Sequence, residues 1–75
     1  MITPNEVRRV VEQGDLIEDY PEDARGHSCL MHGEGFKHRT IHVVCSPKED
    51  FLAIITAYLP SERVWGTDLR TRRIR

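Results

Sequence analysis

The chain has 75 residues, of which 39% are hydrophobic and 31% charged, and its formal net charge is −1. This length suits one domain with a thin core, and the composition is that of a globular chain. No apolar run approaches the roughly 18 residues of a membrane span, and no signal peptide precedes the first charged segment. Two cysteines are too few for a secreted disulfide scaffold. We therefore expect a soluble, cytoplasmic, single domain over residues 1–75, with no membrane partner.

The N-terminal segment carries the signals of a helix over residues 4–13. Thr3 and Glu6 have the spacing of a capping box, and Pro4 occupies the first helical position. Gly14 is a residue at which helices commonly end. An apolar stripe at helical spacing is formed by Val7, Val10 and Val11.

Four β-strands are predicted after this helix, over residues 16–20, 28–32, 39–45 and 51–59. The segments between them are short and rich in glycine, proline and acids, and Gly33–Gly35 is predicted to form a hairpin turn. Short connections imply an antiparallel meander. One helical turn is expected over residues 61–65, and a mobile basic tail over residues 69–75. The predicted fold class is α+β, with one N-terminal helix packed on a four-stranded antiparallel sheet.

Side-chain alternation assigns the two faces of this sheet. The face predicted to contact the helix carries Ile41, Val43, Cys45, Ala53, Ile55 and Ala57. The opposite face carries Thr40, His42, Thr56 and Tyr58. Because one helix covers only one face, we expect this second, polar face to be exposed, and we expect Trp65 to cap the core or the edge of the sheet.

His42 and Tyr58 are the candidate catalytic pair on the polar face. An imidazole with a pKa near its usual value of about 6.5 acts as a general acid or base at neutral pH. Tyr58 and Arg39 would position a phosphate and neutralise developing charge. The alternative is structural, because a histidine in a strand more often only forms hydrogen bonds that support the fold.

The remaining histidines and both cysteines give no metal-binding pattern. No CxxC spacing is present and the signal for a metal site is weak, so we predict no metal site. Cys29 and Cys45 are interpreted as small buried hydrophobic residues, although a bridge between them stays open if their strands are neighbours. No P-loop, GxGxxG or nucleophile-elbow motif is present, and we predict no cofactor.

Charge is distributed unevenly along the chain. Residues 1–34 carry eight acids and three bases, whereas residues 35–75 carry four acids and eight bases. The last six residues contain four arginines, namely Arg70, Arg72, Arg73 and Arg75. These are the candidate nucleic-acid-binding residues, and a solvated tail without a ligand is the alternative.

Several of these segments together resemble a family of short bacterial domains of unknown function. The blocks that carry the resemblance are Ile2–Val7, Gly14–Pro21 continuing to Leu30, Arg39–Val44, Ile54–Pro60, Trp65 and Arg72–Arg73. Domains of this type look like distant relatives of RelE-type and BrnT-type toxins, in which an antiparallel sheet cleaves RNA without a metal. The resemblance implies an antitoxin-like protein partner, RNA as a second partner, and a RelE/BrnT-like fold.

Two functions follow from these observations. The first is metal-independent RNA cleavage by a toxin-like domain of a toxin–antitoxin pair, with His42 as general base or acid. The second is a non-catalytic module that binds a protein or a nucleic acid through the exposed sheet face and the basic tail. A His42 within reach of Tyr58 and an arginine favours the enzyme, and an isolated His42 favours the binding module.

Overall fold

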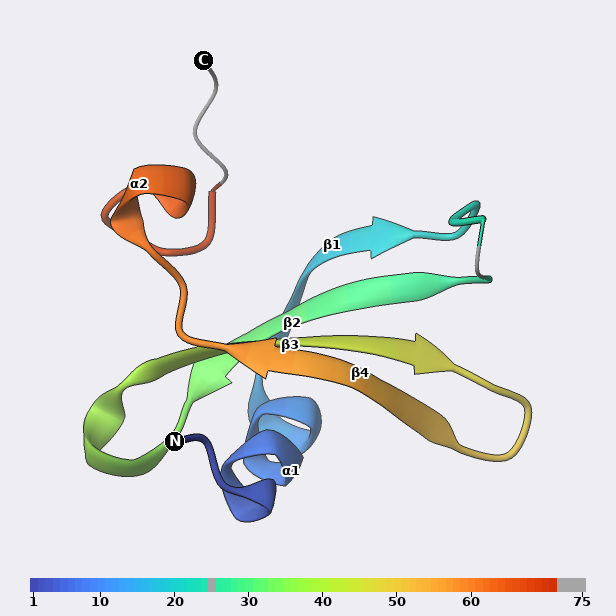
Figure 1. Cartoon of the computed structure of the whole chain (residues 1–75), viewed down its shortest axis with the longest axis horizontal. Helices are drawn as coiled ribbons and strands as arrows, with labels where there is room; N and C mark the ends of the chain where they lie inside the picture. The colour runs from blue at the N-terminus through green and yellow to red at the C-terminus, as the bar shows by residue number, and fades with distance from the viewer. Residues whose placement is uncertain (25, 72–75) are drawn as a thin grey trace.

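The computed structural model describes residues 1–24 and 26–71 and consists of one helix on each face of an antiparallel sheet (Figure 1). The elements are α1 (Pro4–Gln13), β1 (Asp15–Tyr20), β2 (Ser28–Glu34), the short 3-10 turn η1 (Phe36–His38), β3 (Thr40–Pro47), β4 (Leu52–Tyr58) and α2 (Glu62–Trp65). The strands pair in the order β1-β2-β3-β4, and all pairs are antiparallel. The predicted α+β class and the four-stranded meander are confirmed.

Helix α1 begins and ends where the sequence predicts. The Thr3 hydroxyl accepts a hydrogen bond from the Glu6 amide at 3.2 Å, and the Glu6 carboxylate accepts one from the Thr3 amide at 3.0 Å. Gly14 ends the helix with extended rather than left-handed backbone, at φ −81°. A Cβ atom at this position would collide with the carbonyl oxygens of His32 and Val10. Gly14 is therefore required by close packing of the chain against β2.

The connection between β2 and β3 differs from the predicted hairpin at Gly33–Gly35. Strand β2 continues to Glu34, and the chain reverses through η1 before β3 begins at Thr40. Lys37 and His38 both have left-handed backbone, with φ of 57° and 59°. These two residues reverse the chain without a glycine, which is why the glycine pattern misplaced the turn.

The core lies between α1 and strands β2 and β3. Val10, Ile41 and Val43 are at most 1% exposed. Partly buried residues surround them, namely Ile2, Val7, Val11, Met31 and Ala57. Burial of these apolar groups stabilises a helix that would be marginal alone.

The prediction that Ala53 and Ile55 face α1 is wrong. A bulge between β3 and β4 places Ile54 opposite Cys45 and Thr56 opposite Val44, so Ile55 has no partner on β3. The bulge reverses the alternation, and Leu52 and Ile54 lie on the α1 face in place of Ala53 and Ile55. A single inserted residue in the pairing leaves no mark in the sequence.

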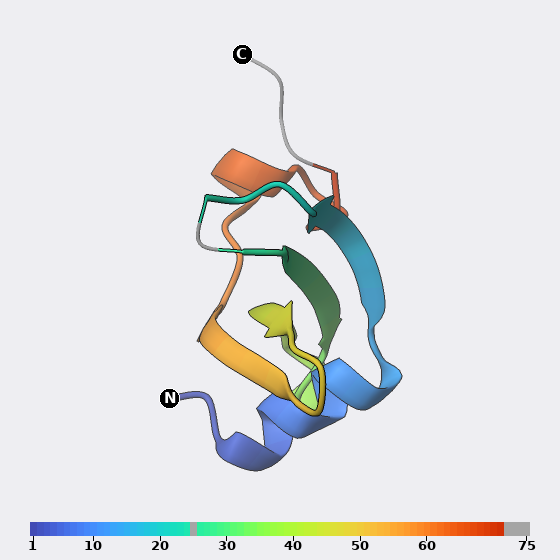
Figure 2. The same ribbon diagram turned by 90° about the vertical axis from the view of Figure 1, so that its right-hand side faces the viewer.

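The second sheet face is not exposed as predicted, because α2 and the turn after it lie over one end of it. Figure 2 shows α1 and α2 on opposite sides of the sheet, with β1 and β4 as its outer strands. Trp65 of α2 is 2% exposed, which confirms its predicted role as a cap. We call α2 together with residues 66–71 the C-terminal cover. Within the described residues, no helix is long and apolar enough to cross a membrane.

Candidate functional site

His42 and Tyr58 lie opposite each other on β3 and β4, on the sheet face away from α1. The Tyr58 hydroxyl is 3.2 Å from Nδ1 of His42. His32 on β2 is the partner of His42 on the other side, and the two rings have centroids 5.2 Å apart. The predicted pairing of His42 with Tyr58 is confirmed, and we call His32, His42 and Tyr58 the histidine cluster.

One backbone carbonyl occupies the centre of the histidine cluster. The Leu69 oxygen is 2.7 Å from Nε2 of His42 and 3.0 Å from Nδ1 of His32. A carbonyl oxygen can only accept, so we assign the proton of the closer nitrogen, Nε2 of His42, as the donor to it. Nδ1 of His32 also lies 3.2 Å from this Nε2, so it donates to the carbonyl in one tautomer and accepts from His42 in the other. In a neutral His42 the other nitrogen, Nδ1, is then an acceptor, and the Tyr58 hydroxyl donates to it. Both nitrogens of His42 are therefore occupied.

The cover seals His42 from solvent. The Trp65 ring contacts His42 edge-on at a centroid separation of 4.6 Å, and His42 is 0% exposed. A buried imidazole with satisfied nitrogens supports the fold in the same way as other buried polar groups that have found partners. In this arrangement a substrate reaches His42 only if the C-terminal cover moves away.

The turn that presents the Leu69 carbonyl is itself well supported. Leu69 has left-handed backbone at φ 57°, which is costly for a non-glycine residue. The Asp68 carboxylate accepts hydrogen bonds from the Arg70 and Thr71 amides at 2.9 and 3.1 Å. These bonds lower the pKa of Asp68. Arg70 forms an ion pair with Asp15 at 2.7 Å and so joins the turn to the start of β1.

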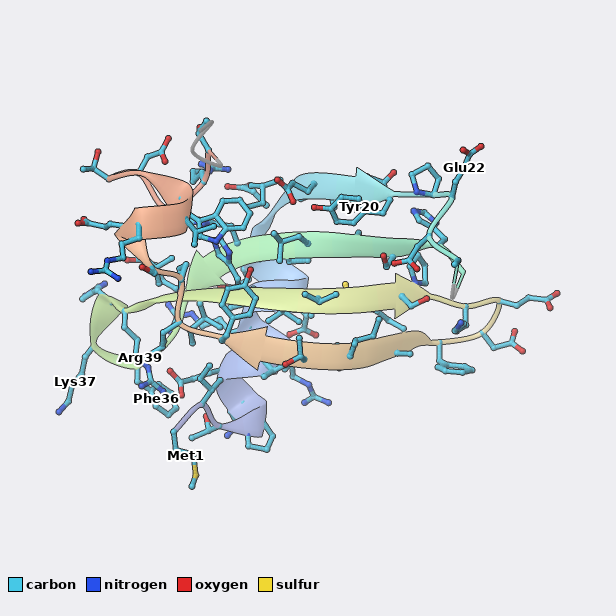
Figure 3. All side chains as sticks on the ribbon, turned by 45° about the horizontal axis from the view of Figure 1, so that its top comes forward. Met1, Tyr20, Glu22, Phe36, Lys37 and Arg39 are labelled. Carbon is cyan, nitrogen blue, oxygen red and sulfur yellow. The ribbon has the colours of Figure 1, made fainter. Side chains whose placement is uncertain are left out.

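Arg39, the third candidate catalytic residue, is held elsewhere by Glu6. Two guanidinium nitrogens donate to the Glu6 carboxylate, at 2.7 and 3.0 Å, and the Phe36 amide donates to it at 2.8 Å. Figure 3 shows Arg39 close to Phe36 and toward Met1, at the connection between β2 and β3. Glu6 is 0% exposed, and hydrogen bonds from Arg39 and then the Thr3 amide lower its pKa from 4.5 to about 2. The pKa of Arg39 is raised in turn by its hydrogen bond to Glu6.

The structure thus brings together two of the three predicted catalytic residues and places the third in a structural ion pair. Of the four predicted nucleic-acid-binding arginines, Arg70 pairs with Asp15. Arg72, Arg73 and Arg75 lie outside the described residues.

The two cysteines are direct neighbours across β2 and β3. Their sulfur atoms are 3.2 Å apart, both are free thiols, and both are buried. Burial, with the Cys29 contact as a second cause, raises the pKa of Cys45 to about 12. A thiol with so high a pKa is a poor nucleophile. Across residues 1–24 and 26–71, no group of three or more His, Cys, Asp or Glu side chains is arranged to hold a metal ion.

An apolar surface lies on the opposite side of the sheet, where α1 leaves β4 uncovered. The groove there has a volume of about 590 Å³ and is lined by Pro4, Val7, Arg8, Val11, Glu12, Leu52 and Ile54. Helix α1 packs mainly on β2 and β3, so among the described residues Ala57 of β4 reaches the core while Leu52 and Ile54 stay partly exposed beside the helix. We call this groove together with the outer edge of β4 the α1–β4 surface.

Sequence analysis missed His32, the Leu69 carbonyl and the α1–β4 surface. No side-chain pattern could reveal a backbone carbonyl within hydrogen-bond distance of two histidines. The α1–β4 surface did leave a signal, because the segment from Phe51 to Tyr58 has no charged residue, which is unusual for an outer strand.

Comparison with known proteins gives one match. The model of the family described as "Domain of unknown function (DUF4258)" matches residues 1–59, which include α1 and all four strands. No curated protein and no solved structure matches the chain.

Proposed function

The chain belongs to the DUF4258 family, and from this premise we propose that it is a non-catalytic module that binds a protein through its α1–β4 surface. The observation that carries the proposal is the exposure of large apolar side chains there. Leu52 and Ile54 are 37% and 46% exposed on the floor of the groove. Contiguous apolar surface of this kind typically marks a contact with another protein.

The wall of the groove has the spacing of a helix-packing surface. Pro4, Val7 and Val11 recur along α1 at intervals of three and four residues, which is the spacing that packs against a neighbouring element. Arg8 and Glu12 stand beside them and supply one charge of each sign. An apolar floor with a charged rim suits a partner whose contact segment is apolar and flanked by complementary charges.

The competing function is RNA cleavage by His42, Tyr58 and Arg39, and it remains a prediction. Two features weigh against it. His42 is buried with both nitrogens hydrogen-bonded, and the cation intended to neutralise phosphate is paired with Glu6. The toxin–antitoxin association is retained in our proposal as the nature of the partner, an antitoxin-like protein encoded beside this chain.

Two assays test the proposal. The first incubates RNA with the parent and with Tyr58→Phe, and we expect intact RNA from both. RNA cleaved by the parent and spared by Tyr58→Phe would establish the enzyme instead.

The second assay co-expresses the chain with the product of the adjacent reading frame and measures recovery of the complex. We expect binding to the parent and to Leu16→Lys, which alters an exposed residue of β1, and loss of binding with Ile54→Lys. Equal recovery with both lysine variants would show that the α1–β4 surface is not the binding site.

A further inference from the structure

The outer edges of the sheet differ in a way that bears on self-association. Strand β1 carries three acids among its six residues and is interrupted by a bulge between Leu16 and Glu18. Strand β4 has seven residues, none of them charged and none a proline. Charges and bulges are the usual protection of an outer strand, and unprotected edges pair with further strands. Of the two edges, β4 is the one open to pairing.

The exposed apolar residues of this edge are arranged symmetrically. Phe51, Leu52, Ile54 and Ile55 are 66%, 37%, 46% and 45% exposed. They lie two on each side of Ala53. In an antiparallel pair of identical strands centred on Ala53, Leu52 would lie opposite Ile54 of the second copy, and Phe51 opposite Ile55.

The bulge in β4 favours a β4–β4 pairing centred on Ala53 over one centred on Ile54. Residues opposite each other must lie on the same face of a sheet. Leu52 and Ile54 both face α1, and Ala53 and Ile55 both face the other side, so a pairing centred on Ala53 satisfies the requirement. A pairing centred on Ile54 would set Leu52 opposite Thr56, which lies on the other face because of the bulge.

Charge permits the same pairing. The segment whose faces match runs from Phe51 to Ile55, and it contains no charged residue, so no two like charges meet within it. The corresponding self-pairing of β1 would bring carboxylates of Asp15, Glu18 and Asp19 toward their own copies, which is unfavourable.

We propose that β4 pairs with β4 of a second copy of this chain, antiparallel and centred on Ala53, to form a continuous eight-stranded sheet in a two-fold dimer. The inference rests on the proposed function, because it places a second copy at the strand edge of the same α1–β4 surface whose groove receives the antitoxin-like partner. The pairing gives the outer backbone groups of β4 hydrogen-bond partners and sets the four exposed apolar side chains beside those of the second copy. The two grooves then adjoin across the dimer axis, where Leu52 and Ile54 of both copies form one floor.

Cross-linking of the full-length chain tests the register. Two copies of Ala53 would have Cα atoms about 4.5–5.5 Å apart. This lies within the roughly 4.4–6.8 Å that a disulfide spans. With oxidised glutathione as oxidant, Ala53→Cys is expected to give a covalent dimer. Thr56→Cys on the same strand is the matched control, because its two copies would be about 20 Å apart. The parent protein, treated in the same way, shows whether Cys29 or Cys45 forms any of the cross-links.

Light scattering after size exclusion, over a range of concentrations, tests the dimer itself. We expect twice the single-chain mass for the parent and Leu16→Lys, and the single-chain mass for Ile54→Lys with an unchanged circular dichroism spectrum. A single-chain mass for the parent at every concentration, or equal cross-linking of Ala53→Cys and Thr56→Cys, would overturn the inference. Binding of the adjacent-frame product by a monomeric parent would overturn it while leaving the protein-binding function in place. Cleavage of RNA by a dimeric parent would overturn the proposed protein-binding function and leave the dimer in place.

Discussion

The helices on the two faces of the sheet are held there by different interactions. The α1 face is closed by apolar packing of Val10 on Ile41 and Val43, with the Glu6–Arg39 ion pair at one end. One end of the opposite face is covered through the histidine cluster, in which His42 donates to the Leu69 carbonyl and packs against Trp65. Helix α1 has ten residues and a capping box, whereas α2 has only four residues, with Ser61 as its N-cap.

This difference indicates how each cover is held. Apolar burial is roughly proportional to area and needs no special geometry. Hydrogen bonds to one carbonyl need that carbonyl in one place, which the turn around Asp68 provides. Two of the residues that suggested catalysis, His42 and Tyr58, thus lie where they help to hold the four-residue α2 on the sheet.

The largest effect is expected from Val10→Asp, which breaks the α1 side of the comparison. Val10 is 1% exposed at the centre of the core. An unpaired carboxylate there should cost several kcal/mol, enough to unfold so small a domain. Circular dichroism during thermal unfolding measures it, and a melting curve equal to that of the parent would refute the packing described here.

A large but more local effect on stability is expected from His42→Ala, which removes the contacts that hold the C-terminal cover on the sheet. Loss of the ring leaves a cavity beneath Trp65 and removes one donor from the Leu69 carbonyl, with a cost of roughly 2–4 kcal/mol. Trp65 fluorescence should shift to longer wavelength at denaturant concentrations where the sheet is still intact. The milder Tyr58→Phe removes one hydrogen bond and should cost about 1 kcal/mol. If the Trp65 fluorescence and the circular dichroism of the sheet changed at the same denaturant concentration in His42→Ala, the C-terminal cover would not unfold separately from the sheet.

Low pH is expected to weaken the α1 side of the sheet through Glu6. Because the pKa of folded Glu6 is about 2, below its ordinary value of 4.5, ionised Glu6 stabilises the fold fully above pH 4.5. This contribution is lost as the pH falls toward about 2. In Glu6→Gln we therefore expect lower stability at neutral pH, and a difference from the parent that narrows across this range. Urea unfolding at several pH values measures the effect, and a constant difference would show that Glu6 is not the titrating group.

The smallest effect on the fold is expected from replacing Arg70, Arg72, Arg73 and Arg75 with glutamine. The Arg70–Asp15 pair is exposed, so its loss should cost less than about 1 kcal/mol. If the tail binds nucleic acid, the parent should bind RNA at low salt with a steep salt dependence, and the glutamine variant should not. Titrations at low and moderate salt compare the two, and equal binding would place the site elsewhere, such as around Lys37 and His38.

Much of the fold was predictable because its signals are local. The cap formed by Thr3 and Glu6, the apolar stripe of α1 and the order of the strands follow from neighbouring residues. The bulge at Ile55 could not be predicted, because it depends on how two strands pair. The role of Arg39 was also hidden, since its partner Glu6 lies 33 residues earlier in the chain.

The candidate site was predicted in part, for a related reason. Alternation along the strands correctly placed His42 with Tyr58. The expected exposure was wrong because a four-residue helix and one backbone carbonyl, neither of which has a strong sequence signal, cover that face.

The central claim is that His42 is a structural residue with both ring nitrogens occupied. Long-range proton–nitrogen spectra of the histidine side chains at neutral pH test it most directly. We predict that the His42 ring carries its proton on Nε2 and not on Nδ1, that this proton exchanges slowly with solvent, and that its signals do not move when RNA is added. A rapidly exchanging His42 proton, or His42 signals that shift with RNA, would contradict the account and return His42 to the role of a catalytic residue.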